Sequence, residues 1–305
     1  MSAIPWIGMD IVEFKNYIKH KTLETIGVIS ENALKKLKKG ISGLWPDIDK
    51  QKYLSIPYPF IAFLVGLIDG DGYIQITRTA KGFIAMKLTI SLHLNDLATL
   101  EYIRSILNIG KITIYKDLKS PTCRLVINKT DLQQILFPLL IYHNIFFLTT
   151  TRIIQFNKAM YILKNNIKQF DLIPDNIPPV FTLPTTALEY IKLNFFKNWI
   201  VGFTMAEGSF FIKSNNDGCF TLTQRLHIEL FEAIKLIFNT TRKIESSTYS
   251  RFSVSSRADI QTVINFFSFS GLHPLVGLKG IQYLSWLENL SKSIRYKNLN
   301  FPSNV

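Results

Sequence analysis

The sequence predicts an α+β fold built from two pseudo-symmetric αββαββα repeats, and two observations lead to this fold class. An apolar stretch that ends in an acid and a glycine occurs twice, at residues 64–72 and 200–208. Each copy is followed by alternating apolar and polar residues, the period of a half-buried strand. We therefore expect two antiparallel four-stranded sheets, one per repeat, joined through the paired helices of the repeated stretch.

Each repeated stretch carries small residues four positions apart. They are Gly66 with Gly70, and Gly202 with Ala206. Residues four apart share one face of a helix, and a face of small residues lets two helix backbones approach closely. The acids that end the two stretches are 136 positions apart (207 − 71 = 136), about the size of a compact domain. If the helices pack on these faces, Asp71 and Glu207 reach the same end and form one shared acidic site.

Alternation predicts the strands of both repeats. In the first they are expected at 73–79, 84–93, 112–115 and 123–127, and in the second at 209–213, 220–223, 243–245 and 251–255. Helices are expected after Asn95-Asp96, near Thr130-Asp131, over 226–238 and from Asp259. The repeat ends also correspond, because Arg152 and Gln155 recur as Lys279 and Gln282 (279 − 152 = 127).

These patterns predict four segments of the chain. They are an N-terminal extension (1–57), a first repeat (58–157), a linker (158–194) with four prolines from Pro174 to Pro184, and a second repeat (195–305). The extension holds a candidate amphipathic helix at 31–39 with a lysine cluster. Its role as a DNA-contacting arm, a capping helix or a fusion remnant stays open.

Composition narrows the function classes. Among 305 residues, 35 Lys and Arg oppose 22 Asp and Glu, a net charge of +13 that favours a polyanion partner, nucleic acid before an acidic membrane surface. No apolar run approaches the ~20 residues of a membrane span. Cys123 and Cys219 are too few for a disulfide framework and indicate a reducing compartment. The five histidines lack zinc-site spacing, and no secretory or import signal is evident.

Each predicted sheet has one apolar face and one polar face. Two such polar faces side by side would form a basic groove for duplex DNA, in which strand side chains reach base edges. Two close carboxylates repel each other, and a divalent cation relieves that repulsion. Carboxylate oxygens suit Mg²⁺, which would assist in-line attack on a phosphodiester.

The two repeated stretches resemble those of the LAGLIDADG homing endonucleases, in the single-chain, organellar intron-encoded form. The resemblance covers about residues 58 to 290. It implies saddle-shaped sheets, a monomer, and a Mg²⁺-dependent hydrolase that cuts both strands of a long, rare DNA site, leaving 3′ overhangs. It also implies an origin in a mitochondrial genome and a role in intron mobility. Mn²⁺ is expected to substitute for Mg²⁺, and Ca²⁺ to bind without supporting cleavage.

The resemblance also implies the site residues. Asp71 and Glu207 match the metal ligands, Gln224 matches a strand glutamine beside the active site, and Lys279 and Arg152 match a basic residue that stabilises phosphate charge. The DNA-facing set comprises Tyr73, Gln75, Thr77, Lys87, Thr89, Ser91, Arg124, Ser209, Phe211, Lys213, Thr221, Thr223 and Arg251.

The sequence departs from the family pattern at three places. Met205 stands where the first repeat has Asp69, a position that is not a metal ligand. Leu92 stands in the place of Gln224, which predicts unequal rates for the two strand cuts. Arg152 matches Lys279, although a planar fork is not equivalent to a point charge. Two alternatives remain open: an RNA maturase on the same fold that binds its own intron, and a non-catalytic DNA-binding protein.

Overall fold

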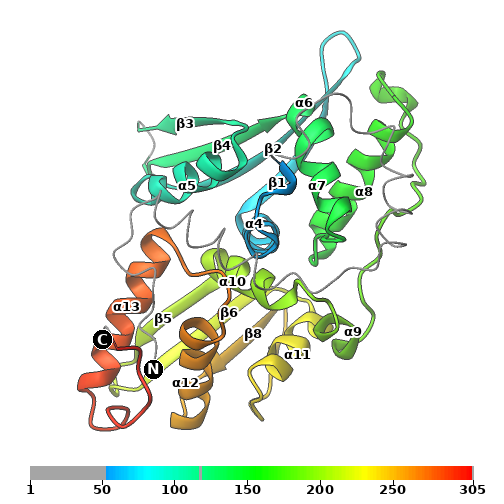
Figure 1. Ribbon diagram of the computed structural model, residues 1–305. Helices are drawn as coiled ribbons and strands as arrows, with labels where there is room; N and C mark the ends of the chain where they lie inside the picture. Colours follow the sequence, from blue (N-terminus) through cyan, green and yellow to red (C-terminus); the bar gives the residue numbers. More distant parts are fainter. Residues whose placement is uncertain (1–52, 117–118, 304–305) are drawn as a thin grey trace. The chain divides into compact units, whose positions relative to one another are not determined.

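The computed structural model describes residues 53–116 and 119–303 (Figure 1). The amphipathic helix expected at 31–39 lies outside these residues. Among them, the chain divides into two compact units. We call residues 53–61, 71–116 and 119–183 the N-terminal unit, and residues 62–70 and 184–303 the C-terminal unit. The first repeated helix therefore contributes its middle to the C-terminal unit, whereas the acid at its end belongs to the N-terminal unit.

The N-terminal unit contains the first sheet and its helices. Its strands pair antiparallel in the order β1-β2-β4-β3, with bounds β1 Gly72–Arg78, β2 Ile84–His93, β3 Lys111–Tyr115 and β4 Thr122–Asn128. Its helical elements are η1 Leu94–Asp96, α5 Leu97–Leu107, α6 Lys129–Asp131, the π-helical η2 Leu132–Leu136, α7 Phe137–Tyr142, α8 Thr150–Lys164 and η3 Phe170–Leu172. Helix α4, Tyr58–Asp71, leads into β1.

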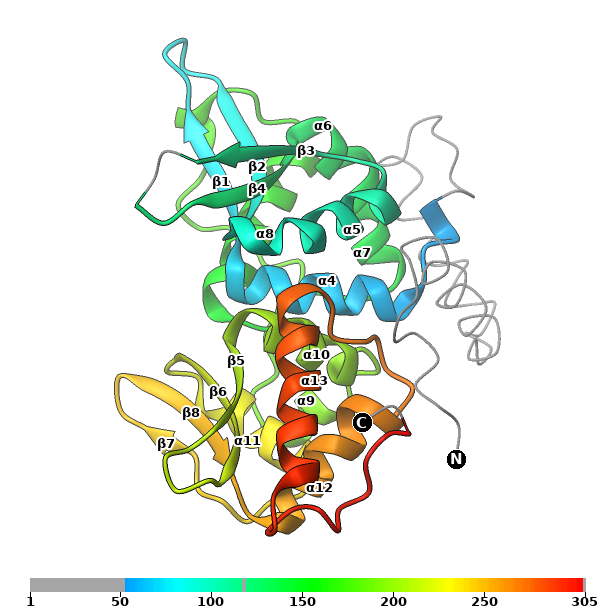
Figure 2. The ribbon, with the colours of Figure 1, turned by 90° about the vertical axis from the view of Figure 1, so that its left-hand side faces the viewer.

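The C-terminal unit repeats this order. Its strands pair antiparallel as β5-β6-β8-β7, with bounds β5 Gly208–Ile212, β6 Gly218–Arg225, β7 Glu245–Ser246 and β8 Tyr249–Val254. Its helical elements are α9 Ala187–Ile191, α10 Phe196–Glu207, α11 Ile228–Ile237, α12 Arg257–Ile264, the π-helical η4 Asn265–Phe269 and α13 Gly277–Lys292 (Figure 2). The same strand order in both units confirms the predicted two-repeat α+β class.

The two repeated helices pack through their small residues. A Cβ atom built on Gly66 would lie 2.0 Å from the carbonyl oxygen of Trp199 in α10, and one built on Gly202 would lie 1.8 Å from that of Phe63 in α4. A Cβ on Gly70 would lie 2.2 Å from the Cβ of Ala206. These separations leave no room for a side chain, so the predicted close approach of the two backbones is confirmed.

Each sheet buries the face predicted to be apolar. In the first sheet Leu88, Ile90, Leu125 and Ile127 are fully buried. The second sheet buries aromatic rings instead, with Phe210 stacked on Phe220 at 4.8 Å between ring centroids. Cys123 lies on the buried face of β4, whereas Cys219 lies in β6 opposite Phe211, on the other face of its sheet. Both are buried strand residues and neither is disulfide-bonded, as predicted.

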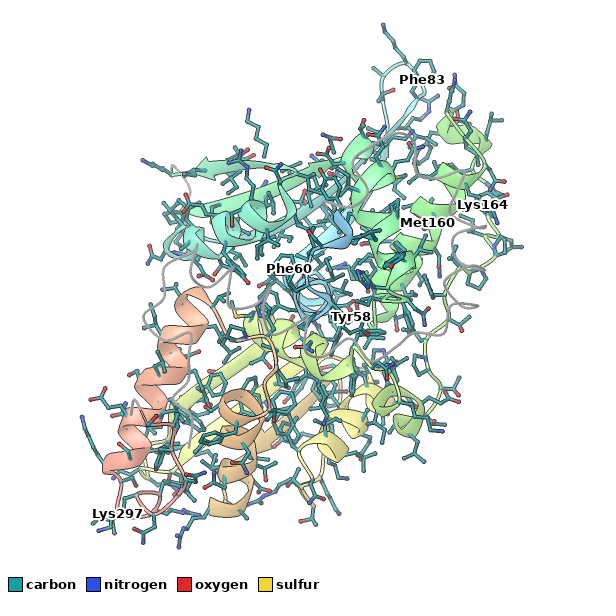
Figure 3. The ribbon with its side chains drawn as sticks, in the orientation of Figure 1. Tyr58, Phe60, Phe83, Met160, Lys164 and Lys297 are labelled. Atoms are coloured by element: carbon teal, nitrogen blue, oxygen red, sulfur yellow. The ribbon has the colours of Figure 1, made fainter. Side chains whose placement is uncertain are left out.

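The segment expected to be an extended linker is partly regular. Helix α8 continues to Lys164 because Ala159, Met160, Ile162 and Leu163 extend its buried face past residue 158 (Figure 3). Helix α9 also lies within the expected linker, and Thr186 caps it by accepting a hydrogen bond from the Glu189 backbone N–H. The division into an extension, two repeats and a linker stays a prediction.

The chain after α8 lies along the β1–β2 turn. The backbone N–H of Ile84 donates to the carbonyl of Lys168, and that of Phe170 donates to the carbonyl of Gly82. Phe83, labelled in Figure 3, forms a bridge with Gln169 within this contact. The hairpin thus gains a third segment at its tip. Among the described residues, no helix is both long enough and apolar enough to span a bilayer.

Candidate nucleic-acid interface and catalytic acids

The polar face of the first sheet gathers the residues predicted for it. Tyr73 lies opposite Thr89, and Gln75 lies opposite Lys87, so the two pairs share one face. The pairing of β2 with β4 adds Ser91 opposite Arg124, while Thr77 extends the same face along β1. Successive strand residues alternate between faces, so this register places every predicted residue of the first repeat on one side.

Thr89 requires a correction. It shares the polar face, but it is 2% exposed, and its Oγ1 has no hydrogen-bond partner among the described residues. Its cross-strand neighbours are Tyr73 and Val126, which flank it with larger side chains. Thr89 is therefore a packed member of this face and not an open hydrogen-bonding group.

Arg124 is held on the same face by an aromatic ring. Its guanidinium carbon lies 4.6 Å from the ring centroid of Tyr115, a cation–π contact. Its Nε is buried without a hydrogen-bond partner among the described residues. Tyr115 and Thr113 were not predicted as site residues, although Thr113 lies directly opposite Arg124. The alternation of β3 was the signal that could have identified both residues.

The second sheet has a matching polar face. Ser209 lies opposite Thr221, Phe211 opposite Cys219, and Thr223 opposite Arg251. These predicted residues again lie on one side of their sheet. Lys213 follows β5, and its Nζ donates a hydrogen bond to Ser255 Oγ at 3.5 Å.

Arg251 has more partners than Arg124. Its Nε donates to Thr223 Oγ1 at 3.2 Å, and its Nη1 lies 3.8 Å from Glu245 Oε2. Its guanidinium carbon also lies 5.6 Å from the ring centroid of Tyr249. Glu245 and Tyr249 were not predicted as site residues, although strand alternation places both on the side of Arg251.

Glu207, the last residue of α10, is positioned by a strand glutamine. Gln224 Nε2 donates to Glu207 Oε1 at 2.6 Å, and Gln224 Oε1 accepts from the backbone N–H of Arg225 at 2.7 Å. The second bond fixes which end of the amide faces the acid. The structure therefore brings together two residues that the family resemblance implied for one site.

Lys279 reaches the backbone immediately after this acid. Its Nζ donates to the carbonyl of Gly208 at 2.5 Å. A Cβ atom on Gly208 would lie 2.5 Å from Thr204 Cγ2, so the step from acid to strand requires glycine. The lysine thus places its charge beside the turn that carries Glu207.

The corresponding contacts of the first repeat differ. Arg152 Nη1 donates to Gln155 Oε1 at 3.4 Å, and this oxygen also accepts from the Ile74 backbone N–H at 3.0 Å. Arg152 therefore contacts the start of β1 through Gln155. Gly72 pairs with Ile90, and Leu92 lies two residues after Ile90. In the same way, Gly208 pairs with Leu222, and Gln224 lies two residues after Leu222. The register confirms that a leucine occupies the place of the glutamine.

Asp71 ends α4 and is partly exposed. The residue before it, Gly70, lies against the other acid: a Cβ atom built there would be 3.4 Å from Glu207 Oε1. The small residue at this place therefore leaves space for the carboxylate of Glu207.

Asp69 has a packing role that explains its replacement in the second repeat. It is 2% exposed and accepts a hydrogen bond from Trp199 Nε1 at 2.7 Å. With the offset of 136 between the repeats, Asp69 corresponds to Met205 (205 − 69 = 136) and Trp199 corresponds to Phe63 (199 − 63 = 136). Met205 and Phe63 are both apolar and buried. The two helices thus carry a hydrogen-bonded polar pair at one place and two buried apolar residues at the equivalent positions.

The donor set suits a hard cation. The candidate ligands are two carboxylates, and the described residues contain no group of three or more His, Cys, Asp or Glu side chains that could hold a metal ion. Mg²⁺ is typically bound by one or two carboxylates together with water and substrate phosphates. Asp71 and Glu207 each carry a carboxylate of the kind that this mode of binding uses.

Comparisons with known proteins agree with this description. The chain is 27% identical over 230 residues to the probable intron-encoded endonuclease aI3 of Dictyostelium citrinum, covering 71% of this chain and 89% of that protein. It is 23% identical over 290 residues to the probable intron-encoded endonuclease aI3 of Debaryomyces hansenii, covering 81% of this chain but only 40% of that protein.

Solved structures share the fold. The I-LtrWI LAGLIDADG homing endonuclease bound to target DNA has a TM-score of 0.59 at 20% identity, over 80% of this chain and 97% of that one. I-SmaMI bound to an uncleaved DNA target in the presence of calcium ions has a TM-score of 0.56 at 19% identity, over 76% and 90%. The LAGLIDADG endonuclease sequence profile matches residues 64–163 and 200–290, more than half of the chain. Because the match includes both repeats, the chain belongs to the LAGLIDADG endonuclease family.

Proposed function

We propose that this chain is a site-specific homing endonuclease, which makes a metal-dependent double-strand break with 3′ overhangs in a long duplex DNA target and so promotes the mobility of its intron. The observation that carries the proposal is that both family-matched helices end in a carboxylate, Asp71 in one and Glu207 in the other.

The polar sheet faces support duplex DNA as the substrate. Each face presents an arginine beside hydroxyl side chains, Arg124 with Ser91 and Arg251 with Thr223. Arginine and hydroxyl groups read base edges and phosphates, and the net charge of +13 favours a polyanion. Lys87 and Lys213 would hold phosphates. The structures bound to DNA have the same fold.

Asp71 and Glu207 would hold Mg²⁺. A bound cation would supply activation of a water molecule and stabilisation of charge on the leaving 3′ oxygen. Gln224 keeps the carboxylate of Glu207 in one orientation through its 2.6 Å hydrogen bond. Lys279 and Arg152 would add positive charge against the scissile phosphates. We expect Mn²⁺ to replace Mg²⁺, and Ca²⁺ to support binding without cleavage.

We propose further that the protein acts as a monomer in the mitochondrion. One chain contains both acids, so no second copy is needed to complete the pair. Two relatives are named as probable intron-encoded endonucleases, which supports an intron as the origin of this chain.

A cleavage selection on a randomised duplex library tests the proposal. It compares the wild-type protein in Mg²⁺ and in EDTA with Glu207→Gln and Asp71→Asn in Mg²⁺. Glu101→Gln, an exposed acid on α5, is the matched control. We expect cutting at one long enriched site in Mg²⁺ for the wild type and the control, and loss of double-strand cleavage, with DNA binding kept, in the two acid variants.

The outcomes separate the alternatives. Double-strand cleavage by either acid variant would refute the assignment of the acids. A library that is bound but never cut would favour a non-catalytic DNA-binding protein. Binding of the candidate host intron RNA, without cutting of DNA, would favour the maturase.

A further inference from the structure

The two sheets carry an arginine at the same place in their registers. Arg124 lies opposite Ser91, and Arg251 lies opposite Thr223. Ser91 follows Ile90, which pairs with Gly72, and Thr223 follows Leu222, which pairs with Gly208. Counted from the glycine after each acid, the two arginines therefore lie at equivalent positions in their sheets. We call the residues paired across the strands at this position a row.

Each of these arginines is oriented by a tyrosine. Arg124 lies over Tyr115, and Arg251 lies over Tyr249, although the two rings come from different strand positions. A stacked guanidinium loses less rotational freedom on binding, which favours the bidentate contact that arginine makes with O6 and N7 of guanine. The arrangement therefore suits a base contact in both rows.

The third member of the row differs between the sheets. Thr113 lies opposite Arg124, whereas Glu245 lies opposite Arg251. A carboxylate on a face that meets phosphates lowers affinity for DNA in general. Its presence favours a hydrogen-bond donor on the DNA, and the N4 amino group of cytosine is the donor that Glu and Asp read in the major groove.

We infer that Arg251 and Glu245 together read one G·C base pair, Arg251 contacting the guanine and Glu245 the cytosine, while Arg124 reads a guanine without help from an acid. This inference rests on the proposed DNA-binding function. It makes Glu245 a specificity-determining residue and makes the two half-sites different at their equivalent position.

The pair between Arg251 and Glu245 is able to open for DNA. Its charged atoms are 3.8 Å apart, and the two side chains are 44% and 61% exposed. Exposed ion pairs of this kind contribute little to stability, so each partner exchanges the other for a base edge at low cost.

A binding selection tests the inference. The full chain is incubated with a randomised duplex library in EDTA and in Ca²⁺, and bound sequences are compared for the wild type, Glu245→Gln, Arg251→Ala and Arg124→Ala. The matched control is Glu288→Gln, which removes the same charge from an exposed ion pair with Lys292 on α13. Circular dichroism confirms the fold of each variant.

We expect Glu245→Gln and Arg251→Ala to weaken selection at the same G·C position, by roughly 5- to 150-fold for a lost specific contact. Glu245→Gln should also bind unrelated duplex more tightly, whereas Glu288→Gln should select the wild-type sequence. Arg124→Ala should affect a position in the other half-site. An unchanged selection in Glu245→Gln, or separate positions for Glu245 and Arg251, would overturn the inference.

Different results would refute the proposed function and this inference. A wild-type protein that selects one sequence but does not cut it in Mg²⁺ contradicts the nuclease and leaves the Glu245 comparison decisive. A wild-type protein that binds no duplex DNA contradicts both proposals.

Discussion

Gln224 shows how a single side chain makes the two halves of the candidate site unequal. It donates to Glu207 at 2.6 Å, and in the first repeat Leu92 occupies its place. A leucine cannot donate a hydrogen bond to Asp71. Groups that orient a metal ligand typically change activity by about 10- to 100-fold when they are removed.

We therefore expect Gln224→Leu, which copies the residue of the first repeat, to slow one strand cut by roughly 10- to 100-fold. Nicked DNA should accumulate before linear DNA when supercoiled plasmid carrying the target is digested in Mg²⁺. DNA affinity should stay close to that of the wild type. Equal slowing of both cuts would show that Gln224 does not act on one acid alone.

The burial of His143 predicts a stability that depends on pH. Burial lowers its pKa from the ordinary value of 6.5 to about 4, and its Nε2 has no hydrogen-bond partner among the described residues. The unfolded chain takes up a proton near pH 6.5, whereas the folded chain does so only near pH 4. Between these values the unfolded state binds more protons, so stability falls as the pH falls.

We expect His143→Phe to flatten this loss between pH 6.5 and about pH 4, by up to about 3 kcal/mol in the free energy of unfolding. The phenyl ring would keep the edge contacts with Tyr58 and Tyr142. Urea unfolding at several pH values measures the effect. The same pH dependence in the variant and the wild type would exclude His143 as its source.

At the scale of elements, the paired repeat helices combine close backbone packing with one polar pair. The small residues bring the helices together, and Asp69 then accepts the indole N–H of Trp199. At the matching place, Phe63 and Met205 need no hydrogen bond. The second repeat has Met205 in place of the acid, and the first repeat has Phe63 in place of the indole donor. A buried carboxylate is therefore present only where an indole N–H is available to it.

A double-mutant cycle measures this pair. We expect Trp199→Phe to cost about 1–3 kcal/mol in the free energy of unfolding, because it removes the donor to a buried carboxylate. Adding Asp69→Met, which copies the apolar pair, should restore part of that loss. Guanidinium unfolding gives both values, and additive effects of the two changes would contradict a direct interaction.

At the scale of the whole molecule, the positive charge determines how binding responds to salt. The net charge of +13 predicts an affinity for duplex DNA that falls steeply as salt rises, because phosphate contacts release counterions. Lys87 and Lys213 lie at the polar faces of the two sheets. Each is predicted to contact a phosphate.

We expect Lys87→Ala and Lys213→Ala each to reduce the slope of log affinity against log salt by about 1. Fluorescence anisotropy with a labelled duplex at several salt concentrations measures the slope. Lys297→Ala, far along the chain near the C-terminal end of the described residues, serves as the control (Figure 3). A smaller slope in the control would point to a general charge effect.

Much of the fold was predictable because its signals are local. The alternation of apolar and polar residues predicted the strands, and the small residues four apart predicted the close helix pair. The recurrence of Arg152 as Lys279, at the same offset as Gln155 and Gln282, indicated the duplication. The helical end of α8 was not predicted, because its buried face continues to Lys164 through residues after 158 that lack a clear helical signal in the sequence.

The sequence by itself predicted the repeated stretch with its terminal acid, and the polar face of each sheet, because each of these patterns lies within a short segment of the chain. Only the tertiary structure decided which side chains meet. Glu207 and Gln224 are 17 positions apart, and Asp69 and Trp199 are 130 apart. Such contacts depend on strand register and helix packing, which also bury Thr89 and place Glu245 beside Arg251. Residue periodicity indicates the face on which a side chain lies, but its partners follow from how distant segments pack.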